Sequence, residues 1–522
     1  MKKLFRPLLA ALLACTALLT ACGAKPQTEQ APADTTPQQT QTETKDEVKE
    51  EVKVEEKEEE PTAPTKEELE AQRQAALAAE AERRAAMPIP EKSDYVFDED
   101  NIVVTFGAFA DTHLRVAGSK NDYTNDNLNA AISFLREVSN DGLDALFLAG
   151  DLTDSGLSGQ VSSFAAGLGD LNIPVMFATG NHDQLNSAMT SYMQKSLSEA
   201  AFGSDIDTDN NAPYCRHSVV GGIHFIQVSA NSYYKGQPSY TEELINWLAS
   251  RLEIAAADAP GMPIFVSTHL PISNSVFGSN AVSAAYPTLV WASEELKATL
   301  DRYPQVVLMS GHTHYPHVAE NSIVQDGFTM VNVGTLKHTV VDYWFANSTD
   351  TLTGSRYHPG GMLVEVDANG GVRMTRYDFG SKVAIDDTWI LPPASHEDFL
   401  SVYTYGRANS VNTFPTKDLA VESVPGGSST SRTLRLTFSS ADSSDNRVYY
   451  YQVDIQADNS TEVKTLKYIS DFAFAPQAED MQARWTIDVE KISIGASYTI
   501  TVTPYSVWNM PGESQTVTID LK

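Results

Sequence analysis

The sequence is poor in cysteine and in basic residues, and each shortage excludes a class of protein. The 522 residues contain 3 cysteines, and Cys15 and Cys22 lie in or just after an N-terminal apolar stretch, so no disulfide framework can hold the fold. We expect Cys215 to be a small buried hydrophobic side chain and not a nucleophile. Lysine and arginine number 37 against 68 aspartates and glutamates, for a net charge of -31. Such an acidic surface repels polyanions, which argues against nucleic acid as a partner.

Long apolar runs are also scarce, and the one at the N-terminus is too short for a comfortable membrane span. It covers residues 8–19, follows three basic residues and ends in Leu-Thr-Ala-Cys, with the cysteine at position 22. This pattern resembles the bacterial lipoprotein signal. The resemblance implies that residues 1–21 are removed and that Cys22 is lipidated. An uncleaved anchor helix is the alternative. Either reading predicts an extracytoplasmic protein held at the cell membrane. Residues 1–21 contain three basic and no acidic side chains, so their removal would change the net charge from -31 to -34.

Residues 22–92 have a composition that cannot bury a core. The segment is rich in Gln, Thr, Pro, Glu, Lys and Ala and has almost no aromatic side chains. Residues 65–68 have the capping-box form, and the Ala- and Glu-rich stretch after them predicts a solvated helix that ends before Pro88. We expect an acidic, disordered or helical stalk.

Five polar blocks, each directly after a short apolar run, are the most informative feature of the chain. The runs at 102–110, 145–149, 175–179, 264–268 and 306–309 predict strands buried on both faces. The blocks that follow them are Asp111-x-His113, Gly150-Asp151-x-x-Asp154, Gly180-Asn181-His182-Asp183, His269 and Gly311-His312-Thr313-His314. Open α/β sheets place their ligands at the carboxyl ends of strands, so we expect the blocks to converge.

The donor types in these blocks predict a metal site. Carboxylate and amide oxygens suit hard divalent ions, and imidazoles suit borderline ones. A pair of ions can clamp the attacking and leaving oxygens of a displacement at phosphorus and can turn a bridging water into hydroxide near neutral pH. One Asp-x-His or Gly-Asp-x-x-Asp alone is often a turn or a helix cap. The five together are harder to explain structurally, because polar groups after buried strands are costly without partners.

In order and identity, the blocks resemble those of the calcineurin-like metallophosphoesterase superfamily, over residues 101–380. The resemblance implies one metal held by Asp111, His113 and His314, a second held by Asn181, His269 and His312, and Asp151 bridging both. The sequence leaves the two divalent ions open among Mn, Fe, Zn and Co.

The resemblance also implies roles beside the metals. His182 would face the leaving-group oxygen as a proton donor or a positive group. Asp154 would orient and charge His182 through its carboxylate. Asp183 would lie outside the ligand set and support it. Residues 150–156 are similar to the corresponding segment of bacterial class III cyclic nucleotide phosphodiesterases, and Asp154 stands where purple acid phosphatases carry a metal-binding tyrosine.

The pattern around the blocks predicts an α/β catalytic domain over residues 93–385. Apolar residues recur at helical spacing over 125–138 and 241–252. After Gly311, short strands at 328–333, 362–366 and 372–377 indicate a second sheet packed on the first. The superfamily resemblance implies a four-layer αββα sandwich.

The C-terminal part differs from the catalytic domain in the spacing of its predicted strands. Regularly spaced short strands at 433–439, 448–456, 462–469, 485–489, 497–503 and 515–519 predict an all-β sandwich of the immunoglobulin or fibronectin kind. Residues 414–522 resemble a fibronectin type III domain, with Tyr498 in the tyrosine corner. Such domains act as spacers or adhesive modules, so contacts with the cell wall or surface are expected from this part. Residues 386–413 are expected to be a linker.

Two functions stay open at this point. The first is a surface-anchored two-metal phosphoesterase that hydrolyses small phosphomonoesters or phosphodiesters, either nucleotide-like or derived from wall polymer or lipid. The second is an adhesion or binding lipoprotein in which the fibronectin-like module has the main role. The complete ligand set favours the enzyme.

Overall fold

The structure is a computed structural model, and residues 70–522 form one compact unit. It describes residue 75 and residues 78–119, 123–169, 171–189, 191–192, 214–234, 237–279, 294–341, 359–426, 428–442 and 445–522. The signal segment, Cys22 and the capping box at 65–68 lie outside these residues. Within the described part, no helix has the length and apolarity needed to cross a membrane.

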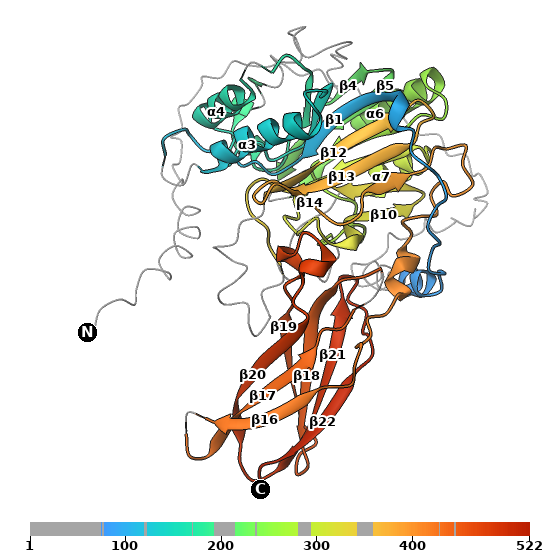
Figure 1. Cartoon of the computed structure of the whole chain (residues 1–522). Coiled ribbons are helices and arrows are strands. Elements are labelled where there is room, and N and C mark those ends of the chain that lie inside the picture. Colours follow the sequence, from blue (N-terminus) through green and yellow to red (C-terminus); the bar gives the residue numbers. More distant parts are fainter. Residues whose placement is uncertain are drawn as a thin grey trace, which may run out of the picture. The chain divides into compact units, whose positions relative to one another are not determined.

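The first sheet of the catalytic domain combines strands from both ends of that domain (Figure 1). In the described residues its order is β14 (Val383–Ala384), β13 (Val372–Asp378), β12 (Gly360–Asp367), β1 (Ile102–Phe109), β2 (Ala145–Ala149) and β3 (Val175–Ala178), and β15 (Trp389–Leu391) pairs with β13. The strands β1, β2 and β3 are parallel, whereas β12 runs antiparallel to β1.

The second sheet is also mixed. Its order is β10 (Ile323–Asp326), β11 (Phe328–Asn332), β9 (Val306–Ser310), β8 (Ile264–Thr268), β5 (Ile223–Val228) and β4 (Arg216–Val220). The four central strands are parallel, and the two edge strands run antiparallel to their neighbours. A small hairpin of β6 (Ser232–Tyr234) and β7 (Gln237–Ser239) follows β5.

The expected grouping of strands into sheets was wrong. The strands after Gly311 do not form a sheet of their own, because β11 joins β9 whereas β12 and β13 join β1. The block-bearing strands are likewise divided, with β1, β2 and β3 in one sheet and β8 and β9 in the other. Both sheets therefore contribute strand ends to the site.

The two sheets face one another and helices cover their outer faces. The apolar cluster between the sheets contains Phe106 of β1, Phe225 of β5 and Phe265 of β8, with ring centroids 4.8–5.4 Å apart. The helices α3 (Tyr123–Val138) and α4 (Ser158–Leu168) pack on the first sheet, and α6 (Glu242–Asp258) and α7 (Glu294–Leu300) pack on the second. The mixed α/β sandwich with two sheets is thus observed.

The helix α6 shows why the local sequence forms this element. Thr241 has an extended backbone, and its side chain accepts a hydrogen bond from Leu244 N, which satisfies one of the unpaired N–H groups of the first turn. Glu242 and Glu243 follow it, where negative charge is favourable. The buried face carries Leu244, Leu248 and Leu252, which pack in the second helix–sheet layer.

Residues 386–413 are not a free linker. Trp389 and Leu391 in β15 are buried between the sheets, and Tyr405, in the short helix Tyr405–Asn409, is buried beside α6 and α7. The end of the predicted stalk is packed as well, because the Arg84 guanidinium lies 3.4 Å from the centre of the Tyr405 ring and Asn409 Nδ2 donates to Met87 O. The apolar side chains of both segments explain why they stay on the domain.

The C-terminal residues form two antiparallel sheets around one apolar cluster. One sheet has the order β16 (Ala420–Pro425), β17 (Ser431–Ser439) and β20 (Arg484–Ser493). The other has the order β19 (Val463–Ile469), β18 (Val448–Ala457), β21 (Ser497–Ser506) and β22 (Gln515–Asp520). The Tyr498 hydroxyl donates to Ser493 O at 2.8 Å, as a tyrosine corner does. The strand β16 was not expected from the sequence.

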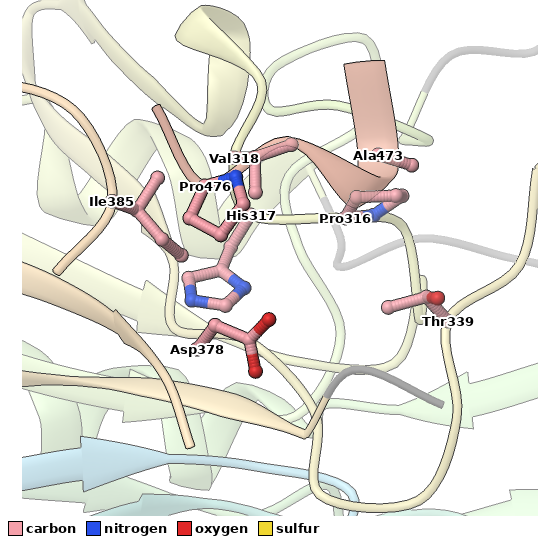
Figure 2. Close-up of a pocket in the computed structure, with 8 residues that line it drawn as sticks. All are labelled: Pro316, His317, Val318, Thr339, Asp378, Ile385, Ala473 and Pro476. Carbon is pink, nitrogen blue, oxygen red and sulfur yellow. The ribbon is translucent and has the colours of Figure 1, made fainter. Parts of the chain in front are cut away.

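The C-terminal sheets contact the catalytic domain through a second apolar cluster. Phe277 packs edge-on against Tyr315, Tyr449 and Phe472, at centroid distances of 4.8–6.1 Å. Val318, Ile385 and Ala473 of this cluster also line a narrow cavity, in which His317 faces Asp378 (Figure 2). With a volume of about 10 Å³ the cavity has room for one water molecule at most, so it is not a ligand pocket.

Candidate metal centre

The five blocks converge although their strands lie in two sheets. The first two blocks are joined through the main chain, because Asp111 N donates to Gly150 O at 3.0 Å and His113 N donates to Asp151 O at 2.9 Å. The blocks of β8 and β9 are joined in the same way, since Gly311 N donates to His269 O at 3.1 Å. These bonds fix the ends of the strands relative to one another.

The converging side chains form three groups with metal-ligand spacing, one of which, His113 with Asp151 and His182, shares residues with both of the others. The other two are Asp111 with His113 and His314, and Asp151 with His269 and His312, and in each group the ligand atoms all lie within 4.8 Å of one another. All six residues of these two groups are buried. The two groups match the ligand sets that the resemblance implied, apart from Asn181.

Asp151 lies between the two groups. Its Oδ2 is 3.4 Å from His113 Nε2 and 3.2 Å from His269 Nε2. Burial raises the pKa of Asp151, but the positive charge and hydrogen bond of His269 outweigh burial, and the pKa lies well below its usual range. A carboxylate that stays ionised between two sets of nitrogen donors suits a bridging ligand.

Imidazole nitrogens face one another in both groups. His113 Nε2 is 3.2 Å from His314 Nε2, and His269 Nε2 is 3.0 Å from His312 Nδ1. Burial and neighbouring positive charge hold the pKa of His113 and of His312 well below the usual range, so both rings are neutral and can donate a lone pair. Burial lowers the pKa of His269, but the charge and hydrogen bond of Asp151 raise it to about 9, so at neutral pH a proton lies between His269 and His312. A bound metal ion would take the place of this proton.

Asn181 adds an oxygen donor with no partner. Its Oδ1 is buried and has no hydrogen-bond partner among the described residues. An unsatisfied buried acceptor costs free energy, and a cation would remove that cost. The donor set of imidazoles, carboxylates and one amide oxygen therefore fits divalent metal ions.

Main-chain carbonyls orient two of the rings. His269 Nδ1 lies 3.0 Å from Ala149 O, and His314 Nδ1 lies 3.0 Å from His338 O. A carbonyl accepts from an N–H group, so Nδ1 carries the proton and Nε2 is left as the ligand atom. The sequence indicated no role for the His338 side chain. The residue contributes its main-chain oxygen, which orients His314.

The backbone at the site is strained. Asp111, His113, Asp151, His312 and His314 have φ values between 43° and 70°, in the left-handed region. Non-glycine residues are rarely found there, although Asp and His are enriched among those that are. Such strain persists only where the surrounding structure enforces it, and it concentrates at functional sites.

The glycines in the blocks allow close approach. A Cβ atom on Gly180 would lie 2.1 Å from Asp151 Oδ1, and one on Gly311 would lie 2.4 Å from the Cβ of Ala110. Any side chain at these positions would displace a ligand loop.

His182 is oriented differently from the expectation. Its Nδ1 lies 2.7 Å from the main-chain oxygen of Asp154, so the peptide carbonyl of Asp154 orients the ring and the carboxylate does not. His182 N donates to Asp151 Oδ1 at 2.9 Å, and its ring is 4.5 Å from that of His113. His182 thus lies at the metal centre with Nε2 as its remaining ring nitrogen.

Asp183 joins two blocks and lies outside the ligand groups. Its carboxylate accepts hydrogen bonds from Leu152 N, Gly180 N and both N and Oγ1 of Thr153, at 2.8–3.1 Å. Burial and the nearby charge of Asp151 raise its pKa to about 6. The carboxylate fixes the loops after β2 and β3 to each other.

Two basic residues at the site were not predicted. Lys337 Nζ lies 3.3 Å from Asp154 Oδ1, and Arg115 Nε lies 3.7 Å from Asp154 Oδ2. No motif contains Lys337, which comes to the site from the loop after β11. Arg115 lies two residues after His113 of the first block, and this nearness in sequence was the available signal.

The comparisons with known proteins agree with this geometry. Residues 104–316, which include all five blocks, match the calcineurin-like phosphoesterase family. A 3',5'-cyclic-nucleotide phosphodiesterase from Nostoc sp. is 24% identical over 284 residues, which cover 52% of this chain and 91% of that protein.

Two solved structures that match part of the chain are distant from it in sequence. GAP50, the anchor in the inner membrane complex of Plasmodium, is 16% identical with a TM-score of 0.38, over 57% of this chain and 91% of that chain. The purple acid phosphatase PPD1 from yellow lupin (Lupinus luteus) seeds is 13% identical with a TM-score of 0.39, over 55% of this chain and 53% of that chain.

Proposed function

We propose that the protein is a dinuclear-metal phosphoesterase that hydrolyses small phosphomonoesters or phosphodiesters. The observation that carries this proposal is the pair of buried ligand groups with Asp151 between them. A hydrolase acting on phosphoesters agrees with the family match. The proposed ligands are Asp111, His113 and His314 for one ion, Asn181, His269 and His312 for the other, and Asp151 for both.

The two ions, when bound, would activate a water molecule and stabilise charge on the phosphoryl oxygens. The chain itself contributes the proton for the leaving group. Asp154 O accepts from the Nδ1–H of His182, which leaves Nε2 as the ring atom that would carry a proton to the substrate. As the oxygen of water bonds to phosphorus and the ester bond breaks, His182 Nε2 donates its proton to the leaving oxygen.

Asp154 has a different role from the one its sequence position indicated. Because its carboxylate contacts Lys337 and not His182, we propose that Asp154 positions His182 through its main chain and the basic residues through its side chain. Asp183 supports Asn181 and His182 by holding their loop against the loop after β2.

The substrate class also includes cyclic diesters. A similar protein from Nostoc is a 3',5'-cyclic-nucleotide phosphodiesterase, and residues 150–156 resemble the corresponding segment of class III cyclic nucleotide phosphodiesterases. A cyclic nucleotide therefore belongs in any substrate panel, beside wall- or lipid-derived phosphoesters.

We further propose that Cys22 carries a lipid and that the enzyme works outside the cytoplasm at the cell membrane. Support comes from the lipobox and from the stalk composition of the residues that follow it. If the Cys22→Ala variant stayed in the membrane fraction to the same extent as the parent, the anchor would be wrong.

Residues 414–522 are proposed to be a fibronectin type III-like module. The three- and four-stranded sheets and the Tyr498 to Ser493 hydrogen bond support this assignment. Surface or wall contacts would then come from the faces of this module that do not pack on the catalytic domain.

A substrate panel tests the enzymatic proposal. The purified protein supplied with Mn(II) should hydrolyse p-nitrophenyl phosphate, bis-p-nitrophenyl phosphate or a 3',5'-cyclic nucleotide. Metal content should be measured on the same sample. A protein that holds metal and leaves all three substrates intact would refute phosphoesterase activity on small substrates.

A further inference from the structure

Two basic side chains and one carboxylate meet beside the metal centre. Lys337 Nζ is 3.3 Å from Asp154 Oδ1, and Arg115 Nε is 3.7 Å from Asp154 Oδ2. Two positive charges against one negative charge leave a surplus of one positive charge at this point. On a chain with a net charge of -31, such a surplus attracts anions locally against the field of the rest of the protein.

The group lies on the side where the leaving group is expected. The main-chain oxygen of Asp154 holds His182 Nδ1 at 2.7 Å, and the carboxylate of Asp154 is 3.8 Å from His113 Nδ1. The basic side chains are therefore next to the residue that we propose as proton donor to the leaving oxygen. A substrate whose phosphorus lies at the metals would extend its leaving group toward them.

Both cations are within reach of a ligand. The side chains of Arg115, Asp154 and Lys337 are 37%, 23% and 15% exposed. Lys337 is partly desolvated, which strengthens its interaction with an anion. Arginine adds a planar set of donors that can bind carboxylate or phosphate through two bonds.

The main chain fixes these residues to the ligand loops. Leu336 N donates to Ala110 O at 3.1 Å, and Lys337 N donates to Thr335 Oγ1 at 3.2 Å. The next residue in the chain, His338, accepts from the metal-site His314 through its carbonyl oxygen. These hydrogen bonds fix the main chain of Lys337 relative to the metal centre, so its position is set by the fold.

We propose that Lys337 and Arg115 bind a second negative charge, on the leaving group of the substrate. This inference rests on the proposed phosphoesterase function. The preferred substrates would be small phosphoesters whose leaving group carries a carboxylate or a further phosphate. Binding this anion would draw the two cations partly away from Asp154, and the hydrogen bond from His182 to the main chain of Asp154 would persist because it does not involve the carboxylate.

A matched pair of substrates tests this selectivity. In 4-carboxyphenyl phosphate the leaving group is anionic, and in 4-(methoxycarbonyl)phenyl phosphate the same position is neutral. With the full chain and Mn(II), the parent protein should have a higher kcat/KM for the anionic substrate. In Lys337→Met and in Arg115→Met this preference should fall by about tenfold, the typical effect of losing one hydrogen bond to a charged group.

Three controls separate selectivity from damage to the fold. Lys337→Arg should restore the preference, because the charge is kept. Arg136→Met removes a cation whose Nε pairs with Asp141 at 3.0 Å at the end of α3, and the preference should not change. Metal content and Tm should stay at the parent values in all variants, since none of these residues is a proposed ligand.

The outcomes are distinguishable. If the parent protein hydrolyses neither substrate, the proposed function fails and this inference fails with it. If both substrates are hydrolysed equally, or if Lys337→Met and Arg115→Met lower both rates by the same factor, the enzymatic proposal stands and the anionic leaving group is refuted. In that case the two cations serve only to neutralise Asp154.

Discussion

Two clusters of buried polar side chains in the described part of the chain differ in how completely their hydrogen bonds are satisfied. At the contact between the catalytic domain and the C-terminal sheets, Arg447 is 2% exposed and its guanidinium is fully engaged. It donates to Asp386 Oδ2 at 2.6 Å, to Phe472 O at 2.9 Å and to Pro476 O at 3.1 Å, and also to Ala475 O. At the metal centre, imidazole nitrogens face each other at 3.0–3.2 Å and Asn181 Oδ1 has no partner among the described residues.

The difference distinguishes a structural cluster from a ligand site. A buried charge with a complete set of partners holds two parts of a protein together. Facing imidazole nitrogens need a proton or a metal ion between them, and a buried amide oxygen without a partner gains free energy from a nearby cation. Backbone strain follows the same division. Five of the seven proposed metal ligands have positive φ values, whereas Arg447 does not.

The largest expected effect is a loss of kcat when a catalytic group is removed and the fold stays intact. His182→Ala should lower kcat by about 10²–10⁴-fold, the usual contribution of a general acid. Because the ring is not a proposed ligand, metal content and Tm should stay near the parent values. Loss of both metals would mean that His182 belongs to the ligand set.

At the structural cluster around Arg447, a substitution should lower stability and leave the metal centre unchanged. Arg447→Met should lower the free energy of unfolding by about 3–5 kcal/mol, since Asp386 and several carbonyl oxygens lose a buried partner. Denaturant titration measures this loss, and the folded variant should keep its metal content. Arg435→Met is the matched control, because Arg435 pairs with Asp488 on the exposed surface of β17 and β20 and the change should leave the unfolding midpoint where it was.

Cys215 should belong to neither cluster, and the smallest effect is expected there. It is 1% exposed, and burial raises the pKa of its thiol to about 12. The thiol stays protonated at neutral pH and is inert toward thiol reagents in the folded protein. Rapid modification of the native protein at pH 8, or loss of activity in Cys215→Ala, would contradict this account.

The individual strands could be predicted from the sequence, and their partners could not. The bounds of β2 and β8 coincide with the apolar runs at 145–149 and 264–268, because strands buried on both faces are continuous apolar segments. The pairing of β1 with β12 joins segments that lie far apart in the chain, and no local pattern specifies it. Strand β16 was missed because its residues are exposed or half-buried and none is fully buried, so no apolar run marks it.

The site shows the same limit. The side chains that converge could be predicted from the five blocks, because each block follows a strand end and contains good metal ligands. They could not show that His182 is held by a main-chain oxygen, or that Lys337 lies beside Asp154, since both contacts depend on loops brought together by the fold. Pro392 and Pro393 indicated a join between two domains, and no local pattern indicated that Trp389 and Leu391 beside them are buried.

Metal stoichiometry tests the central claim most directly. The purified chain, saturated with Mn(II) and freed of unbound ion, should contain about two metal ions per chain, as expected for a dinuclear phosphoesterase. Asp151→Asn should weaken binding of both ions by more than about 100-fold, because loss of even an outer-sphere partner costs 10–100-fold and Asp151 lies between both groups. A parent protein that binds no metal, or an Asp151→Asn variant that keeps both ions, would contradict the account.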